Sequence, residues 1–156
     1  MRTKRAELCR RLIAVGFVSV ACLGAEGEAR ATLGRDVASV VANQQRLAGT
    51  RQVTKLPSGE RHELVLPSGV VVEEYVSPAG AVYAITWRGP RMPDLRELLG
   101  SYFSRLAAHP RAGHHRMSVT GADLVVRSSG HRRSFTGRAW VPSLVPSGVD
   151  VEAVLP

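Results

Sequence analysis

Basic side chains gather near the end of the chain, on both sides of a glycine at position 130. They are Arg127, His131, Arg132, Arg133 and Arg138. A guanidinium group presents paired N–H donors that match the oxygens of a carboxylate or phosphate, so the cluster predicts an anion-binding or partner-binding surface. In a strand, Arg132 and Arg138 would share one face with the hydroxyl groups at positions 134 and 136. The alternative is that these charges only protect an exposed edge strand from aggregation.

A polar loop holds a second group of residues that could do chemistry, His109, His114 and His115. Neutral imidazole binds zinc, copper and nickel, so these histidines are weak candidates for metal ligands. Their spacing matches no ligand motif, and a loop that mixes histidines and arginines is more often simply solvated. We therefore predict no metal site and no cofactor.

The sequence offers little for nucleophilic catalysis. After residue 31 it contains no G-x-S-x-G elbow, no H-E-x-x-H motif and no cysteine. Ser134, His131 and Asp123 would form a triad only if the fold assembled them, because triads are defined by geometry. A small hydrolase therefore remains an alternative to a non-enzymatic protein.

A repeated turn organises the middle of the chain. It occurs as Leu56-Pro57-Ser58-Gly59, Leu66-Pro67-Ser68-Gly69 and Ser77-Pro78-Ala79-Gly80. Proline presets the negative φ of the second turn position, and the glycine can adopt the left-handed conformation. The spacing predicts strands near residues 51–56, 60–66, 70–77 and 81–88, in a four-stranded antiparallel meander.

Alternation along these strands predicts two different faces. The first is aliphatic and should be the main core, with Leu64, Leu66, Val70, Val72, Val76, Val82 and Ala84. The second bears Glu63 and Glu73, and carries Val65, Val71, Tyr75, Tyr83, Ile85 and Trp87. We expect this second face to be partly uncovered, so that Tyr75, Tyr83 and Trp87 form a partner or ligand surface, unless the first helix covers it.

Carboxylates on these strands are not paired for catalysis. Glu73 and Glu74 are adjacent in one strand, so they point to opposite faces. Glu63 is expected across from Glu73, which indicates a face that is solvated or neutralised by arginine.

Two helices and a later hairpin complete the predicted fold. A helix is expected over residues 36–48, and a stronger amphipathic one over residues 94–108, whose leucines should pack on the aliphatic face. Further strands are predicted over residues 117–120, 124–127 and 131–141, with a turn at Ser128-Ser129-Gly130. Residues 142–156 repeat the turn and should wrap the surface. The predicted fold class is α+β: an antiparallel sheet, meander plus later hairpin, with one principal amphipathic helix packed on one face and a weaker N-terminal helix.

The first 31 residues have the pattern of a secretory leader. Basic residues precede an apolar run over residues 12–23, and Ala29-Arg30-Ala31 offers a cleavage site. The run is too short to span a membrane, so no transmembrane segment is expected after cleavage. The mature chain, residues 32–156, would be a single exported domain, periplasmic or secreted. Both cysteines lie in the leader, and the mature net charge would be +5, with fourteen of the fifteen basic residues being arginine.

A resemblance extends over most of the mature chain. It is carried by residues 66–69, 73–80, 87–90, 93–95, 98–100 and 102–103, by Ala31-Thr32-Leu33-Gly34, and by Gly130-His131 and Phe135-Thr136-Gly137-Arg138-Ala139. These segments resemble a bacterial family of exported proteins known as domain of unknown function 2844. The resemblance implies export and a shared fold, and supplies no catalytic residues.

The leading functional hypothesis is an exported, non-enzymatic binding or envelope-associated domain. Its basic surface after export suggests an anionic envelope component or another exported protein as partner, rather than nucleic acid. The alternatives are an accessory protein to another secreted protein and, from a different class, a small hydrolase.

Overall fold

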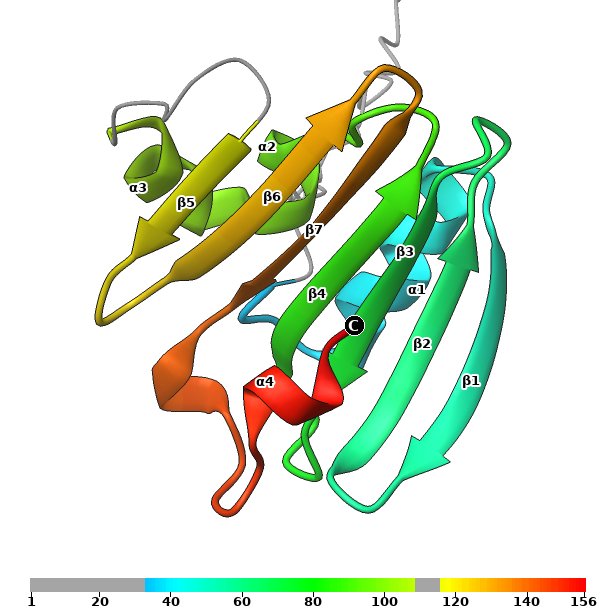
Figure 1. The fold of residues 1–156 in the computed structure, drawn as a ribbon. Coiled ribbons are helices and arrows are strands. Elements are labelled where there is room, and N and C mark those ends of the chain that lie inside the picture. Colours follow the sequence, from blue (N-terminus) through cyan, green and yellow to red (C-terminus); the bar gives the residue numbers. More distant parts are fainter. Residues whose placement is uncertain (1–32, 109–115) are drawn as a thin grey trace, which may run out of the picture.

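A computed structural model describes residues 33–108 and 116–156, which build one seven-stranded antiparallel sheet. The strands are β1 (Thr50–Leu56), β2 (Gly59–Val65), β3 (Val71–Val76), β4 (Val82–Gly89), β5 (Arg116–Thr120), β6 (Val125–His131) and β7 (Ser134–Trp140). Their spatial order is β1-β2-β3-β4-β7-β6-β5, so the predicted meander and the later hairpin join through β4 and β7 (Figure 1). The α+β class is confirmed.

The meander forms because its turns are encoded locally. The Ser77 amide donates to the Ala81 carbonyl, and the Gly80 amide donates back to the Ser77 carbonyl, both at 2.8 Å. Gly80 has φ of 84°, a conformation that residues with a Cβ rarely adopt. The first four strands accordingly lie within one residue of their predicted bounds.

A β-bulge interrupts β4. Tyr75 pairs with Ala84, but the next residue of β3, Val76, pairs with Val82, so Tyr83 is an extra residue on β4. A bulge places two residues of one strand opposite one residue of its partner, and so it changes the phase of alternation. After the bulge, each side chain of β4 therefore points to the opposite face from the one that simple alternation from Val82 would predict.

The bulge overturns part of the predicted face assignment. Ile85 and Trp87 belong to the large core cluster with Val72 and Val82, whereas Ala84 lies in a second cluster with Tyr75 and Tyr83, on the opposite side of the sheet. The faces predicted for Ala84, Ile85 and Trp87 were wrong, because strict alternation has no place for an extra residue.

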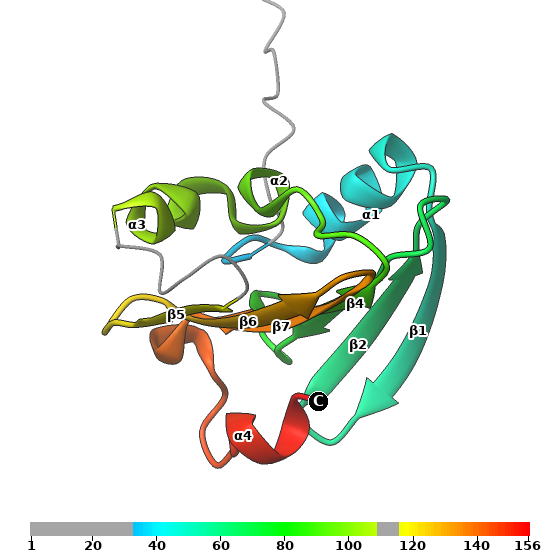
Figure 2. The same cartoon turned by 45° about the horizontal axis from the view of Figure 1, so that its top comes forward.

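Helices cover one side of the sheet, which we call the helix face. They are α1 (Val37–Arg46), α2 (Leu95–Leu99), the 3-10 turn η1 (Gly100–Tyr102) and α3 (Phe103–Ala107), all on the same side in Figure 2. Asp36 and Asp94 cap α1 and α2 by accepting backbone N–H bonds. The predicted leucine stripe packs as expected, since Leu98, Leu99 and Leu106 are buried in the core.

The principal helix is not continuous, contrary to the prediction of one helix over residues 94–108. Gly100 has φ of 51° and ψ of −120°, which ends α2 after five residues. The chain then passes through η1 into α3, which buries Leu106.

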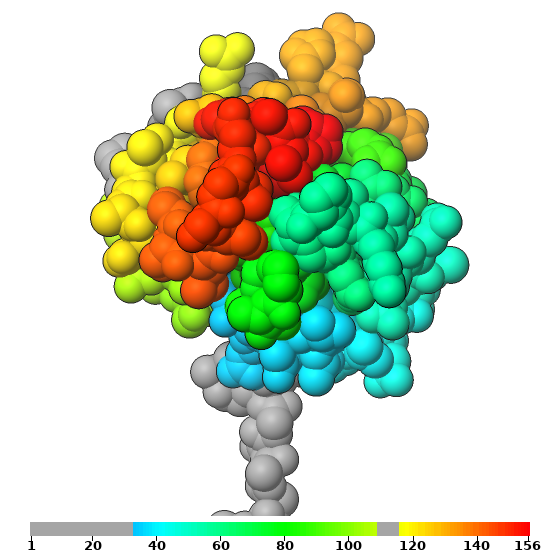
Figure 3. Space-filling view, turned by 90° about the horizontal axis from the view of Figure 1, so that it is seen from below, coloured from blue at the N-terminus to red at the C-terminus, as the bar shows by residue number. Residues whose placement is uncertain are grey.

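The chain after β7 covers part of the other side, which we call the tail face. It contains the 3-10 turn η2 (Pro142–Leu144) and α4 (Val151–Val154), and Figure 2 shows α4 on the side of the sheet opposite α1 and α2. In Figure 3 the red C-terminal segment packs against the turquoise β1–β2 hairpin. The expectation that residues 142–156 wrap the surface is confirmed.

The last hairpin turns later than predicted. β6 continues through Ser128, Ser129 and Gly130, and the connection to β7 consists of Arg132, with φ of 54°, and Arg133. Position 130 has room only for a glycine, because the ring of Phe135 fills the space above it; a Cβ there would lie 2.3 Å from Phe135 Cδ1.

Candidate functional site

The strand register arranges the polar side chains of the tail face in two rows that cross the sheet. In spatial order the first row is Ser118, Arg127, Arg138, Thr86, Glu73 and Glu63. The second row, nearer the β6–β7 turn, is Arg116, Ser129, Thr136, Arg88 and Val71. We call the β5–β7 part of these rows, from Arg116 and Ser118 to Thr136 and Arg138, the arginine face. It combines guanidinium and hydroxyl donors, while the acidic residues lie on β2 and β3.

Arg127 and Arg138 are direct cross-strand partners and share one carboxylate. Arg127 Nη1 lies 2.7 Å from Glu152 Oε1, and Arg138 Nη2 lies 2.6 Å from Glu152 Oε2. Both guanidinium groups also lie over the ring of Trp140, at 5.6 and 5.9 Å from its centroid. A second Arg138 nitrogen donates to the Leu155 carbonyl at 3.1 Å. These residues bind the C-terminal segment as an arginine pair binds a carboxylate ligand.

The remaining predicted basic residues lie elsewhere. His131, Arg132 and Arg133 are exposed in the β6–β7 turn, which projects from the body in Figure 3. Arg132, Arg133 and Arg116 make no ion pair within residues 33–108 and 116–156. The five residues singled out in the sequence thus form two groups, the Arg127–Arg138 pair that binds Glu152 and the residues at the β6–β7 turn.

Glu73 is the hub of the acidic half of the tail face. Its side chain is buried, and it accepts hydrogen bonds of 3.1 Å from the Tyr75 hydroxyl, the Thr86 hydroxyl and Arg88. Burial alone would raise the pKa of Glu73, but these three bonds and the charge of Arg88 outweigh it and lower the pKa. Arg88 also approaches Glu63 at 3.6 Å, so the expected arginine-neutralised face is confirmed.

The aromatic residues do not form an open surface. Tyr75 and Tyr83 lie on the tail face with their ring centroids 6.3 Å apart, and the tail, including Leu155, buries them. Trp87 lies on the helix face and is 1% exposed. The prediction of a partly uncovered Tyr75, Tyr83 and Trp87 face was wrong, and the cover over the tyrosines is the tail rather than α1. Burial and the neighbouring Glu73 carboxylate raise the pKa of Tyr75, so its hydroxyl keeps its proton and remains a donor.

The possible triad is not assembled. Ser134 pairs with His131 across the β6–β7 turn. Asp123 lies at the other end of β6, in the β5–β6 turn, where it pairs with Arg105 at 3.3 Å. A strand rises about 3.3 Å per residue, so the length of β6 keeps Asp123 roughly 20 Å from His131.

Sequence reasoning missed a buried polar network under α1. His62 and Glu74 are cross-strand partners on the helix face and are 1% and 0% exposed. Glu74 Oε1 accepts from the Asn43 amide of α1 at 3.3 Å. The signal was present: Glu74 alternates with Glu73, so it had to lie among the aliphatic residues, where a carboxylate requires polar partners.

His62 is fixed in one tautomer. Its Nδ1 lies 3.3 Å from Arg51 Nη1, and its Nε2 lies 3.1 Å from Glu60 Oε2. Arginine only donates, so Nδ1 must accept and Nε2 must carry the proton that Glu60 accepts. Both ring nitrogens are engaged, which leaves His62 without a free lone pair to act as a general base.

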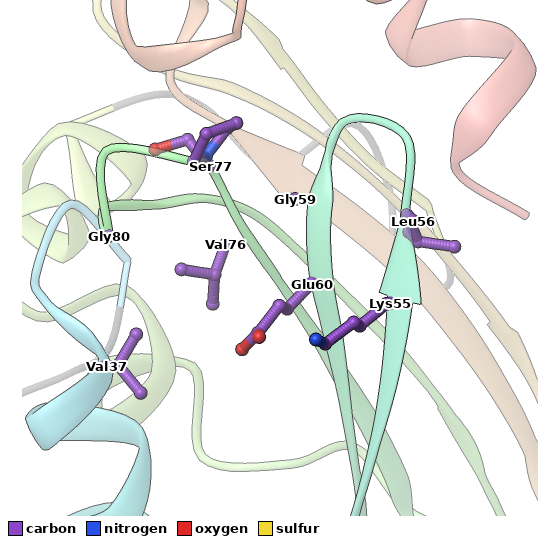
Figure 4. Close-up of a pocket in the computed structure, with 9 residues that line it drawn as sticks. Val37, Lys55, Leu56, Gly59, Glu60, Val76, Ser77 and Gly80 are labelled. Atoms are coloured by element: carbon purple, nitrogen blue, oxygen red, sulfur yellow. The ribbon is translucent and has the colours of Figure 1, made fainter.

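Beside this network lies an open pocket of about 320 Å³ between the start of α1 and the ends of β1 to β3. Figure 4 shows Lys55 and Glu60, cross-strand partners, pointing into it alongside Val37 and Val76. The lining combines one cation, one anion and aliphatic walls. It offers no nucleophile and base in hydrogen-bonding contact among the described residues.

Within residues 33–108 and 116–156, no three His, Cys, Asp or Glu side chains are grouped so that they could hold a metal ion. The weak candidates His109, His114 and His115 lie outside the described residues. No helix of the described segments is both long and apolar enough to cross a membrane.

Comparison with known proteins gives one match. The model of a family described as a protein of unknown function, DUF2844, matches residues 29–154. No curated protein and no solved structure matches the chain significantly.

Proposed function

Because this chain belongs to the DUF2844 family, whose function is unknown, we propose a function from its geometry: an exported, non-enzymatic domain that binds an anionic, phosphate-bearing component of the cell envelope. Export is supported by the basic and apolar segments that precede Ala29-Arg30-Ala31. The binding surface is the arginine face together with the β6–β7 turn.

One observation carries this proposal. The tail covers only the part of the tail face around Tyr75, Tyr83 and Trp140, and the second row of the arginine face stays exposed. There Arg116, Ser129 and Thr136 are neighbours in register, and the turn arginines lie at the end of the same strands. Guanidinium and hydroxyl groups on one flat surface supply several donors to phosphate oxygens.

The enzyme alternative has less support. His62 has both ring nitrogens occupied, and Ser134, His131 and Asp123 are spread along a strand. An acidic protein partner would use the same arginine face, and a mature protein that does not sediment with anionic vesicles would favour it over an envelope lipid.

Vesicle binding tests the proposal. The mature protein should sediment with vesicles of phosphatidylglycerol and phosphatidylcholine, and should not sediment with phosphatidylcholine alone. The double variant Arg116→Gln and Arg132→Gln should lower the affinity about 30-fold, since each basic residue near an anionic surface contributes about 1 kcal/mol. The matched control is the double variant Arg35→Gln and Arg96→Gln; both residues are exposed, Arg35 just before α1 and Arg96 within α2. Equal losses of affinity in both double variants would show that only the net charge of the protein matters. That result would refute the arginine face as the binding surface.

A further inference from the structure

We propose that Glu152 is a built-in competitor for the anion site: it occupies the Arg127–Arg138 pair, and the phosphate group of the ligand replaces it. This inference rests on the proposed function and assigns the site within the arginine face at which one ligand phosphate binds. At this site Arg127 of β6 and Arg138 of β7 face each other, and the carboxylate of Glu152 from α4 binds both.

An anion between the two arginines relieves the repulsion of their charges. Arg127 and Arg138 lie directly opposite each other in register, where like charges repel. Glu152 removes the repulsion by giving one oxygen to each guanidinium, at 2.7 and 2.6 Å. A phosphate group presents the same pair of oxygens, so it fits the same two donors.

Glu152 is accessible to solvent although it binds both arginines. Its side chain is 49% exposed, and it belongs to a helix of four residues. Arg127 is also largely exposed, at 47%, so solvent reaches this side of the pair and screens its contact with Glu152. A ligand phosphate that contacts both guanidinium groups can therefore take the place of the Glu152 carboxylate.

The tail does not have to unfold for this exchange. Leu155 stays buried among Tyr75, Tyr83 and Trp140, and its carbonyl accepts from a different Arg138 nitrogen than the one that binds Glu152. Rotation of the Glu152 side chain alone opens the pair. The exposed Ser129 and Thr136 of the second row are the next donors that a bound phosphate would meet.

The test compares Glu152→Gln with Glu97→Gln. Both variants remove one negative charge, but Glu97 pairs with Arg46 on the helix face. Affinity is measured for phosphatidylglycerol vesicles and for soluble glycerol phosphate. We expect Glu152→Gln to bind at least fivefold more tightly than the wild type, and Glu97→Gln to change affinity less than twofold. Adding Arg127→Gln to Glu152→Gln should abolish the gain.

The outcomes separate this inference from the function on which it rests. If wild type and Glu152→Gln bind equally, and both depend on Arg116 and Arg132, the function stands and the competitor is refuted. If neither binds any probe, both fail. A gain for vesicles alone identifies a lipid headgroup as the phosphate source, whereas a gain for glycerol phosphate as well identifies a free phosphate group.

Discussion

Replacing Glu73 by glutamine should destabilise the protein in a pH-dependent manner. Glu73 lies in the middle of the tail face, where the Tyr75 and Thr86 hydroxyls and Arg88 all donate to its carboxylate. Glutamine has nearly the same shape as glutamate, but only one of its two terminal atoms, the oxygen, accepts hydrogen bonds. Its NH₂ group would face one of the donors that now bind the carboxylate. The substitution therefore breaks the hub without leaving a cavity.

The size of the effect follows from these contacts. A hydrogen bond to a charged group contributes about 1.5 to 3 kcal/mol, and a partner left unsatisfied in the interior adds to the loss. Arg88 is 55% exposed and keeps its 3.6 Å contact with Glu63, so its share is discounted for solvent screening. We expect a loss of about 2 to 4 kcal/mol in the free energy of unfolding at neutral pH.

The pH dependence has a definite sign. The pKa of Glu73 is lower in the folded protein than its ordinary value of 4.5, so ionised Glu73 stabilises the fold above that pH. The carboxyl group has a higher pKa in the unfolded protein, so on acidification it takes up its proton there first. The stabilisation by Glu73 is therefore lost as the pH falls through the folded pKa. The difference between wild type and Glu73→Gln should therefore be full at pH 7 and shrink below about pH 4.5.

Urea unfolding followed by circular dichroism at pH 7, 5 and 4 measures this difference. The matched control is Glu63→Gln, which removes a more exposed carboxylate that contacts the same Arg88 at 3.6 Å, and should lose under about 1 kcal/mol. A difference for Glu73→Gln that stays constant from pH 7 to pH 4, or that equals the control, would refute the role of Glu73 as an ionised hub.

Three further predictions concern packing and capping. Gly137→Ala should lower the free energy of unfolding by about 1 to 3 kcal/mol, because its Cβ would lie 2.3 Å from Trp87 Cζ2; thermal denaturation measures this, and no loss would contradict the close contact. Leu155→Ala should cost about 2 to 5 kcal/mol and alter the near-UV dichroism of the tyrosines beneath the tail; an unchanged spectrum would argue against that packing. Asp94→Ala should cost about 1 kcal/mol in urea unfolding, whereas Asp94→Asn, which keeps the cap, should cost less.

The turns and most of the core could be predicted because their causes are local. Each proline and glycine pair acts within four residues, so the strand bounds of the meander followed directly from the sequence. The bulge at Tyr83 has no such local signal, since strand-forming residues continue on both sides of it, with Ala81-Val82 before and Ala84-Ile85-Thr86 after. One extra residue then reversed the faces of Ile85 and Trp87, and with them the expected aromatic surface.

The arginine cluster shows a different limit. The sequence identified the residue types, and alternation placed Arg138 on a face with Thr136, as the register confirms. Glu152 is 14 residues from Arg138 and 25 from Arg127, and it approaches both only because the tail folds back over the sheet. Whether an arginine forms an ion pair therefore depends on tertiary packing, which cannot be predicted from the spacing of residues in the sequence.

The two sides of the sheet contribute differently to the proposed binding role. On the helix face, buried leucines and Trp87 pack against the strands, and this packing fixes the register of β4, β7 and β6. On the tail face, the same register places Arg127, Arg138 and Thr136 side by side, and the Trp140 ring lies beneath both guanidinium groups. Directly opposite residues have Cβ atoms about 4.5 to 5.5 Å apart, which is close enough for two guanidinium groups to reach one anion. The donor geometry of the arginine face is thus a property of the backbone, and Glu152 changes only whether the pair is occupied.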